Sequence, residues 1–397
     1  MKSRIVKSAA VIAACTAIVA ACSSSNSGSS SSGGAVPSVS DKSSIGGGEG
    51  TLNLIVWAGY AEDGSDDKTV DWVHPFEQQT GCQVNAKVAN TSDEMVQLMR
   101  SGQYDGLSAS GDATLRLIYG GDVAPVNTDL VPNYATVSSF LKQKPWNSVD
   151  GKMYGIPHGW GANVLMYNPA VVKGLQDSWG VVFDPTSPYK GKVTAYDSPI
   201  YIADAALYLS KSKPELGIKD PYSLTEEQLS AAVDLLKQQK AAIGEYWSDY
   251  TKAVQAFESG TSVVGTSWQM IANLIGADKK VTVDTVVPKE GATGWSDTWM
   301  ISAKAAHPNC MYKWMNYIVS PKINAQVAEW FGEAPAQTKA CAQTSDKGFC
   351  GTYHALDEAY AEKIHYWTTP QRKCVDGSGE DCTAYSEWTE KWQQVKG

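Results

Sequence analysis

From residue 51 onwards, apolar runs typical of buried strands alternate with segments of helical periodicity. Residues 52–57 form such a run, residues 69–80 show helical spacing that ends at Thr80-Gly81, and residues 83–88 alternate like a strand. The pattern continues with strands predicted at 104–107, 192–195 and 263–266, and helices at 92–100, about 226–240 and 309–319. This alternation predicts a parallel α/β sheet. The last 345 or so residues exceed one compact core and predict two lobes.

The N-terminal residues predict export. Three basic residues precede the apolar stretch from Ala9 to Ala21, which is too short to span a bilayer stably. The small residues before Cys22 resemble the lipobox of bacterial lipoproteins, which implies a signal peptide over 1–21 and lipidation of Cys22. Residues 22–50 are rich in Ser and Gly and predict a flexible linker, with ends about 30 Å apart. We expect an exported protein, lipid-anchored to the outer face of the cytoplasmic membrane, at the cell surface or in the periplasm.

The charge pattern disfavours nucleic acid as a partner. The formal net charge is −9, and it becomes −12 without residues 1–21, which contain three cations and no anion. The remaining sequence has no Lys/Arg cluster that would bind nucleic acid or an anionic membrane surface.

Six cysteines remain after Cys22, and an even number in an exported chain predicts disulfides. Their short spacings favour pairing within the two C-terminal pairs, which leaves the first two cysteines for each other. No CxxC or His-Cys spacing supports a metal site. The predicted bridges are Cys82–Cys310, Cys341–Cys350 and Cys374–Cys382.

Aromatic and acidic side chains recur where the predicted strands end. Open α/β sheets bind ligands beyond the carboxyl ends of their strands, so these positions are candidates for a ligand site. Trp295 and Asp297 are two apart on one extended segment and therefore point to the same face. The other strand-end candidates are Trp57, Tyr60, Ser110, Asp112, Asp197 and Trp268.

Several segments, in order along the chain, resemble the spermidine/putrescine-binding proteins of bacterial ABC importers. They are "LNLIVWAGY", "FEQQTGCQV", "YGIPHGWGANVLMYNP", "SPYKGKV", "AFESGTSVVGTSW" and "VPKEGATGWSDTWMIS", and they cover roughly residues 51–340. The resemblance implies a two-lobed, type II periplasmic-binding-protein-like α/β fold with two crossing hinge strands and a ligand cleft between the lobes. We expect lobe 1 to contain residues 51–157 and 298–340, and lobe 2 to contain residues 158–297 and 341–397. The resemblance implies no cofactor.

The resemblance also implies a role for each candidate residue. Trp57 and Tyr60 would pack against the ligand, Ser110 would line the site, and Trp268 would form an aromatic wall. The remaining implied roles belong to Asp197, which takes one end of a polyamine, and to Trp295 with Asp297, whose carboxylate holds an ammonium group.

The chain departs from the family at three positions. Asp112 and Glu333 stand where the family has tyrosines, and Ile200 stands about where a second carboxylate would follow Asp197. A polyamine requires aromatic faces for its methylenes and carboxylates for its ammonium groups. We therefore predict that Asp112 and Glu333 add negative charge to the site and favour spermidine over putrescine.

Enzyme classes lack support because the chain has no Gly-x-Ser-x-Gly, His-Glu-x-x-His, phosphate-loop or convincing dinucleotide motif. A sugar receptor of the same architecture is the main alternative, since tryptophans also stack on pyranose rings, and a guanidinium or other organic cation is a third. The predicted partners are a small cationic ligand, the transmembrane subunits of an ABC permease and, through the lipid anchor, the membrane. We expect the protein to be a monomer.

Overall fold

The computed structural model describes residues 39, 42–175, 177–375 and 378–397, which belong to one unit, Ser38–Gly397. The predicted signal peptide and Cys22 lie outside the described residues, as does most of the predicted linker.

Strands β1 (Thr51–Val56), β2 (Gln83–Val88) and β3 (Gly106–Ala109) pair in parallel at one end of the main sheet. Helices α1 (Val73–Thr80), α2 (Ser92–Arg100) and α3 (Gly111–Tyr119) alternate with them, as predicted. The hydroxyl of Thr91, the residue before α2, caps the helix by accepting the Glu94 backbone N–H at 3.1 Å. The hydroxyl of Ser92 is therefore free to bond elsewhere.

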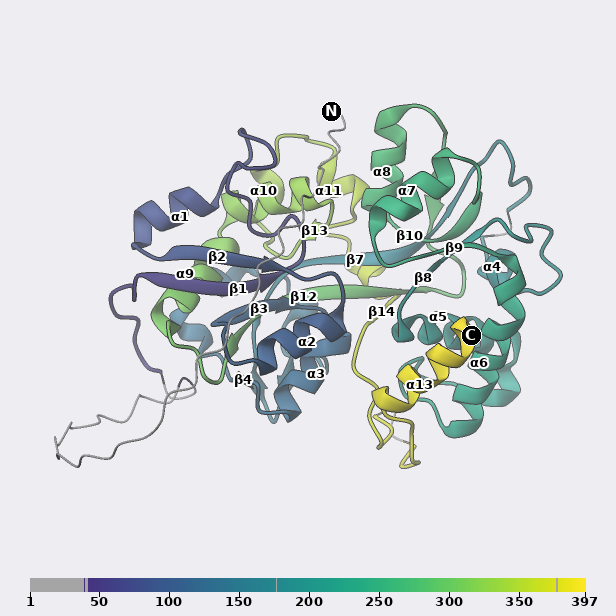
Figure 1. The fold of residues 1–397 in the computed structure, drawn as a ribbon, viewed down its shortest axis with the longest axis horizontal. Helices are drawn as coiled ribbons and strands as arrows, with labels where there is room; N and C mark the ends of the chain where they lie inside the picture. The colour runs from purple at the N-terminus through teal and green to yellow at the C-terminus, as the bar shows by residue number, and fades with distance from the viewer. Residues whose placement is uncertain (1–38, 40–41, 176, 376–377) are drawn as a thin grey trace, which may run out of the picture. The chain divides into compact units, whose positions relative to one another are not determined.

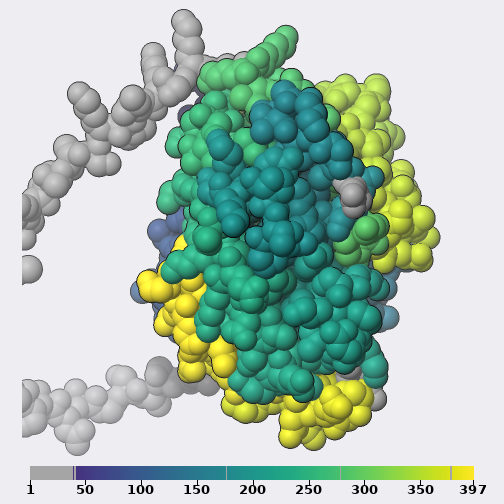
Figure 2. Space-filling view, turned by 90° about the vertical axis from the view of Figure 1, so that its right-hand side faces the viewer, coloured from purple at the N-terminus to yellow at the C-terminus, as the bar shows by residue number. Residues whose placement is uncertain are grey.

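A second parallel group stands at the other end of the sheet, made of β8 (Val193–Tyr196), β9 (Ile243–Trp247) and β10 (Val264–Trp268). Figure 2 shows this part of the molecule from its outer side, with C-terminal segments in yellow at its edges. The main helices around it are α4 (Gly180–Phe183), α5 (Ile202–Ser212), α6 (Glu226–Gln239), α7 (Tyr250–Glu258), α8 (Gln269–Asp278) and α13 (Tyr385–Lys396).

Two long strands, β7 (Ile156–Tyr167) and β12 (Ala292–Ser302), join the two groups (Figure 1). The strand order is β2-β1-β3-β12-β7-β10-β8-β9. The chain crosses in β7 and returns in β12, so these strands are antiparallel to each other, and β12 is antiparallel to β3 and β7 to β10. The sheet is therefore mixed: the predicted parallel pairing occurs within each of the two groups, and the crossing strands are antiparallel to β3 and β10. The fold is α/β with two crossing strands, as the resemblance implies.

Short strands and further helices complete the described chain. The strands are β4 (Val123–Ala124), β5 (Ser148–Val149), β6 (Lys152–Met153), β11 (Asp284–Val286), β13 (Ala334–Pro335) and β14 (Ile364–Tyr366). The helices are α9 (Pro308–Ile318), α10 (Pro321–Phe331), α11 (Phe349–Thr352) and α12 (Glu358–Ala361).

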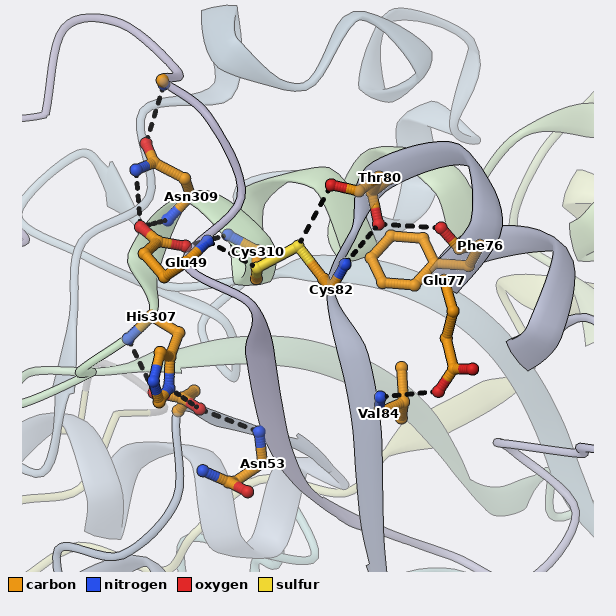
Figure 3. Close-up of a disulfide and its surroundings, with 12 residues drawn as sticks. Glu49, Asn53, Phe76, Glu77, Thr80, Cys82, Val84, His307, Asn309 and Cys310 are labelled. Carbon is orange, nitrogen blue, oxygen red and sulfur yellow. Dashed lines mark hydrogen bonds and ion pairs between the residues drawn. A yellow bond between two sulfur atoms is a disulfide. The ribbon is translucent and has the colours of Figure 1, made fainter.

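The end of the predicted linker packs on α9 (Figure 3). The carboxylate of Glu49 accepts the backbone N–H groups of Asn309 and Cys310, each at 2.8 Å. A carboxylate at a helix N-terminus satisfies free N–H groups and opposes the positive end of the helix dipole. Gly46 donates its backbone N–H to the side chain of Asn309 at 2.8 Å. The segment before β1 is therefore held against the folded unit.

All three predicted disulfides are present: Cys82–Cys310, Cys341–Cys350 and Cys374–Cys382. The first joins the start of β2 to the first turn of α9, across 228 positions of sequence (Figure 3). Closing so long a loop restricts the unfolded chain and contributes roughly 2–4 kcal/mol.

Candidate functional site

Four side chains from distant parts of the chain form a buried hydrogen-bonded group, which we call the acid cluster: Tyr60, Ser110, Asp297 and Glu333. The Tyr60 hydroxyl oxygen lies 2.7 Å from Oδ2 of Asp297 and 2.7 Å from Oε2 of Glu333. Ser110 donates its hydroxyl hydrogen to Oδ1 of Asp297 at 2.5 Å. All four side chains were predicted site residues, and the structure brings them together.

The backbone positions each member of the acid cluster. Tyr60 lies in the turn that follows β1, and Ser110 directly precedes α3. Asp297 is on β12, opposite Gly159 of β7. Glu333 follows α10, and its carboxyl group lies against Gly159, where an added Cβ would come within 2.0 Å of it. Position 159 must therefore be glycine for Glu333 to reach Tyr60.

Burial dominates the electrostatics of the acid cluster. It raises the pKa of Asp297 to about 6, although the Ser110 and Tyr60 hydroxyl groups act to lower it. Burial and the charge of Asp297 raise the pKa of Glu333 well above its usual value. The same causes raise the pKa of Tyr60, so the phenol stays neutral. A buried carboxyl without a cationic partner binds its proton more tightly because desolvation disfavours the anion.

His158, on β7, lies beside Glu333. Its Nδ1 is 3.6 Å from Oε1 of Glu333, and its Nε2 is 2.8 Å from the hydroxyl oxygen of Ser108. Burial lowers the pKa of His158 to about 3, so the imidazole is neutral and does not neutralise Glu333. No ion pair within the described residues joins Asp297 or Glu333 to a lysine or arginine; His158 is the one basic side chain paired with Glu333 there.

Aromatic rings stand next to the acid cluster. The ring of Trp295 is 6.2 Å from that of Trp268 and 5.9 Å from that of Phe331, and Phe331 is 4.3 Å from Tyr60. Trp295 also lies over Gly161, where an added Cβ would come within 2.7 Å of the indole. Trp268 donates its Nε1–H to Asn163 at 3.0 Å, which holds its ring. Trp268 and Trp295 thus lie side by side next to the acid cluster, and the aromatic wall that the resemblance implies for Trp268 stays a prediction.

A small cavity of about 20 Å³ borders these rings and Glu333. That volume accommodates about one water molecule, whereas pockets for small organic ligands measure roughly 300–1,000 Å³. A polyamine therefore requires the surrounding elements to move apart. The lining residues include Trp160, Trp268, Trp295, Glu333, Tyr353 and Tyr360.

A larger hollow of about 750 Å³ lies elsewhere, between Tyr167, α8 and β11. Among the described residues that line this hollow, Asp284 is the one carboxylate, and Gln269 is the one residue that also lines the small cavity. We place the site at the acid cluster because buried carboxyls and aromatic faces meet there, which is the chemistry that a cation requires.

Three predicted residues lie neither in the acid cluster nor in the pair of tryptophan rings beside it. Asp112 on α3 accepts a hydrogen bond from Ser92 at 2.9 Å, and burial raises its pKa to about 6. Asp197 binds the Lys396 ammonium group at 2.7 Å and accepts the Trp392 Nε1–H at 3.2 Å. Trp57 packs between the apolar clusters on the two sides of β1. The structure thus pairs Asp197 with the C-terminal helix instead of with the cluster.

Sequence reasoning missed His158, Phe331 and Asn163. His158 was expected to be structural or exposed, yet it lies beside Glu333. Its neighbour Gly159 is the one local signal, because a glycine inside a buried strand often marks a close approach by another group. The partner that approaches is 174 positions away in the sequence, and no local pattern identifies it.

The family described as bacterial extracellular solute-binding protein matches residues 71–348. The chain belongs to this family. A putrescine-binding periplasmic protein of Pseudomonas aeruginosa is 26% identical over 281 residues, which cover 67% of this chain and 74% of that protein. A spermidine/putrescine-binding periplasmic protein of Escherichia coli is 24% identical over 295 residues, 71% of this chain and 81% of that protein.

Among solved structures, a putative spermidine/putrescine ABC transporter protein from Listeria monocytogenes superimposes with a TM-score of 0.72. It is 18% identical and covers 87% of this chain and 99% of its own. The resemblance to this family is thus confirmed, and so is the two-lobed fold of type II periplasmic binding proteins. The described residues include no helix with the length and apolar character needed to cross a membrane.

Proposed function

We propose that this protein is the extracytoplasmic substrate-binding component of an ABC importer for a polyamine or a closely similar organic cation. The observation that carries the proposal is the pair of buried carboxyls, Asp297 and Glu333, which no lysine or arginine within the described residues neutralises. Buried charges require a partner, and an ammonium group of the ligand would supply it. The names of the two curated relatives support the same class of ligand.

The site contains both kinds of contact that a polyamine needs. An ammonium group carries three N–H donors, which fit the oxygens of Asp297 and Glu333. The faces of Trp268 and Trp295 would pack against the methylene chain and add cation–π attraction of roughly 0.5–2 kcal/mol each. No arginine pairs with these acids in the described part of the chain, which favours a cationic ligand over a sugar.

We also propose that two lobes close around the site. We propose lobe 1 over residues 51–157 and 298–340, and lobe 2 over residues 158–297 and 341–397, with β7 and β12 as the crossing strands. Asp297 is on one of these strands and Gly159 is on the other. Separation of the lobes would enlarge the small cavity, and closure would enclose the ligand for delivery to the permease. Lipidation of Cys22 would hold the protein at the membrane.

The preference for spermidine over putrescine stays a prediction, and fewer acids than expected are available to cause it. Asp197 already has Lys396 as its cation, and Asp112 has Ser92 as its partner. Of the four acids considered, Asp297 and Glu333 thus remain for a ligand.

A calorimetric panel tests the proposed function. We expect putrescine, spermidine, spermine or agmatine to bind and trehalose to give no heat of binding. The variant Asp284→Asn, in the larger hollow, should bind the same amine with unchanged affinity. Binding of trehalose alone would replace the proposal with the sugar receptor, and a loss of binding in Asp284→Asn would move the site to the larger hollow.

A further inference from the structure

Tyr60 has one hydroxyl hydrogen but two close carboxyl contacts. Its oxygen lies 2.7 Å from an oxygen of Asp297 and 2.7 Å from an oxygen of Glu333. Each contact at that distance needs a hydrogen between the two oxygens, since two unprotonated oxygens repel. The phenol supplies one hydrogen, so one of the two carboxyls must supply the other. The ligand-free cluster therefore contains one protonated carboxyl.

The surrounding donors assign that proton to Glu333. Asp297 accepts hydrogen bonds from Ser110 and from Tyr60, which stabilises its anion. Glu333 has no second donor: its Oε1 and the Nδ1 of His158 both lack a hydrogen-bond partner among the described residues. Glu333 then donates to the Tyr60 oxygen, and Tyr60 donates to Asp297.

Titratable and charged groups face this pair from every neighbouring element. Tyr60 follows β1, His158 lies on β7, and Asp297 lies on β12. Tyr353, which follows α11, senses the charge of Glu333, and Asp112 on α3 acts on Asp297 through its own charge. His158 is neutral, so none of these groups offers Glu333 a positive charge.

We propose that Glu333 exchanges its proton for an ammonium group of the ligand, an inference that rests on the proposed function. When the ligand enters, the O–H bond of the Glu333 carboxyl breaks and the proton passes to bulk water. The carboxylate then accepts an N–H from the ammonium group, and Asp297 accepts another. The buried site carries one net negative charge before and after the exchange. One ammonium charge of the ligand is therefore buried without any change in the total charge of the site.

The exchange gives the affinity a defined pH dependence. Each bound ligand releases one proton, so affinity rises with pH while Glu333 is protonated in the free protein and ionised in the complex. The slope approaches about tenfold per pH unit. This range extends from the usual pKa of a glutamate up to the raised pKa of Glu333. Asp297 adds a separate loss of affinity below a pH of about 6, where it becomes protonated.

Titration calorimetry with spermidine and putrescine, in two buffers of different ionisation enthalpy at neutral pH, measures the released protons. We expect close to one proton per ligand for the wild type. Glu333→Gln should release almost none, because its amide can donate to Tyr60 as the protonated acid does but cannot lose a proton. Asp204→Asn is the matched control: Asp204 is another buried acid whose pKa is raised, to about 7, and it bonds to Thr293 outside the cluster. Asp204→Asn should still release close to one proton per bound ligand.

Infrared difference spectroscopy tests the shared proton without a ligand. In the difference between the ligand-free wild type and Glu333→Gln, we expect the carbonyl band of a buried carboxylic acid. The band of Asp204, whose pKa is raised to about 7, cancels in this difference because both proteins contain it. Binding with no proton release, or the absence of this band, overturns the exchange and leaves the proposed function intact. If no amine of the calorimetric panel binds, the proposed function and the exchange both fail, and the infrared band still decides where the shared proton resides.

Discussion

Asp197 and Asp297 are both implied to hold an ammonium group, yet the fold places them in different surroundings. Asp197, directly after β8, binds the Lys396 ammonium at 2.7 Å, and its side chain is 31% exposed. Asp297, within β12, is 2% exposed and has hydroxyl groups of Tyr60 and Ser110 as its donors. Within the described residues, Asp197 has a lysine as its partner and Asp297 has none. A carboxylate at a strand end thus becomes a candidate ligand contact only when its own chain leaves it without a counter-ion.

The largest expected difference between the two aspartates is in how much ligand affinity is lost when each is replaced by asparagine. Asp297→Asn should weaken binding of the best amine ligand by about 2–5 kcal/mol, because it removes a charge that faces a buried ammonium group. Asp197→Asn should change the affinity by less than about 1 kcal/mol, since its exposed partner is Lys396. Titration calorimetry measures both. Equal losses would mean that the ligand reaches Asp197 despite the lysine.

The second-largest expected difference between Asp297 and Asp197 is in the pH dependence of stability. The folded-state pKa of Asp297 is raised to about 6, so its contribution to stability is complete below its unfolded pKa and disappears as pH rises through about 6. Glu333, with its pKa raised by burial, acts in the same direction. The free energy of unfolding of the ligand-free protein should therefore fall between about pH 5 and pH 8, with about 1–2 kcal/mol of the fall due to Asp297.

Urea denaturation at the two pH values provides the measurement. Asp297→Asn should reduce the fall, and Asp197→Asn, whose carboxylate is half-buried and paired with Lys396, should leave it as in the wild type. A fall that is identical in all three proteins would contradict the burial of an uncompensated acid at Asp297.

The smallest effect concerns the lysine itself. The Lys396 ammonium group also lies 3.9 Å from the centre of the Tyr246 ring. Lys396→Met should lower the free energy of unfolding by about 0.5–1 kcal/mol, through the lost ion pair and cation–π contact. Lys391→Met is the matched control on the same helix, because Lys391 pairs only with the exposed Glu226 at 2.9 Å. Lys391→Met should lower the free energy of unfolding by less than Lys396→Met does. Tighter spermidine binding by Lys396→Met would show that Asp197 can serve the ligand once it is freed.

Local patterns predicted several of the elements. The apolar run at 52–57 and the alternation at 83–88 are strands, and the helix predicted from 69–80 ends at Gly81, whose φ of 71° suits glycine. The short cysteine spacings identified two disulfides and left the third by elimination. These features depend on neighbours in the sequence, which is why periodicity and spacing reveal them.

The sequence and the resemblance predicted Tyr60, Ser110, Asp297 and Glu333 as site residues, but only the tertiary structure decided how these side chains are arranged. Tyr60 bonds to residues 237 and 273 positions away, and Lys396 reaches Asp197 across 199 positions. Whether a carboxyl is ionised depends on the donors, charges and apolar atoms that folding brings around it, and those belong to other elements. The sequence therefore determined which acids are present near the strand ends. Folding placed a lysine beside Asp197, gave Asp297 the hydroxyl donors that stabilise its anion, and placed Glu333 where it shares a proton with Tyr60.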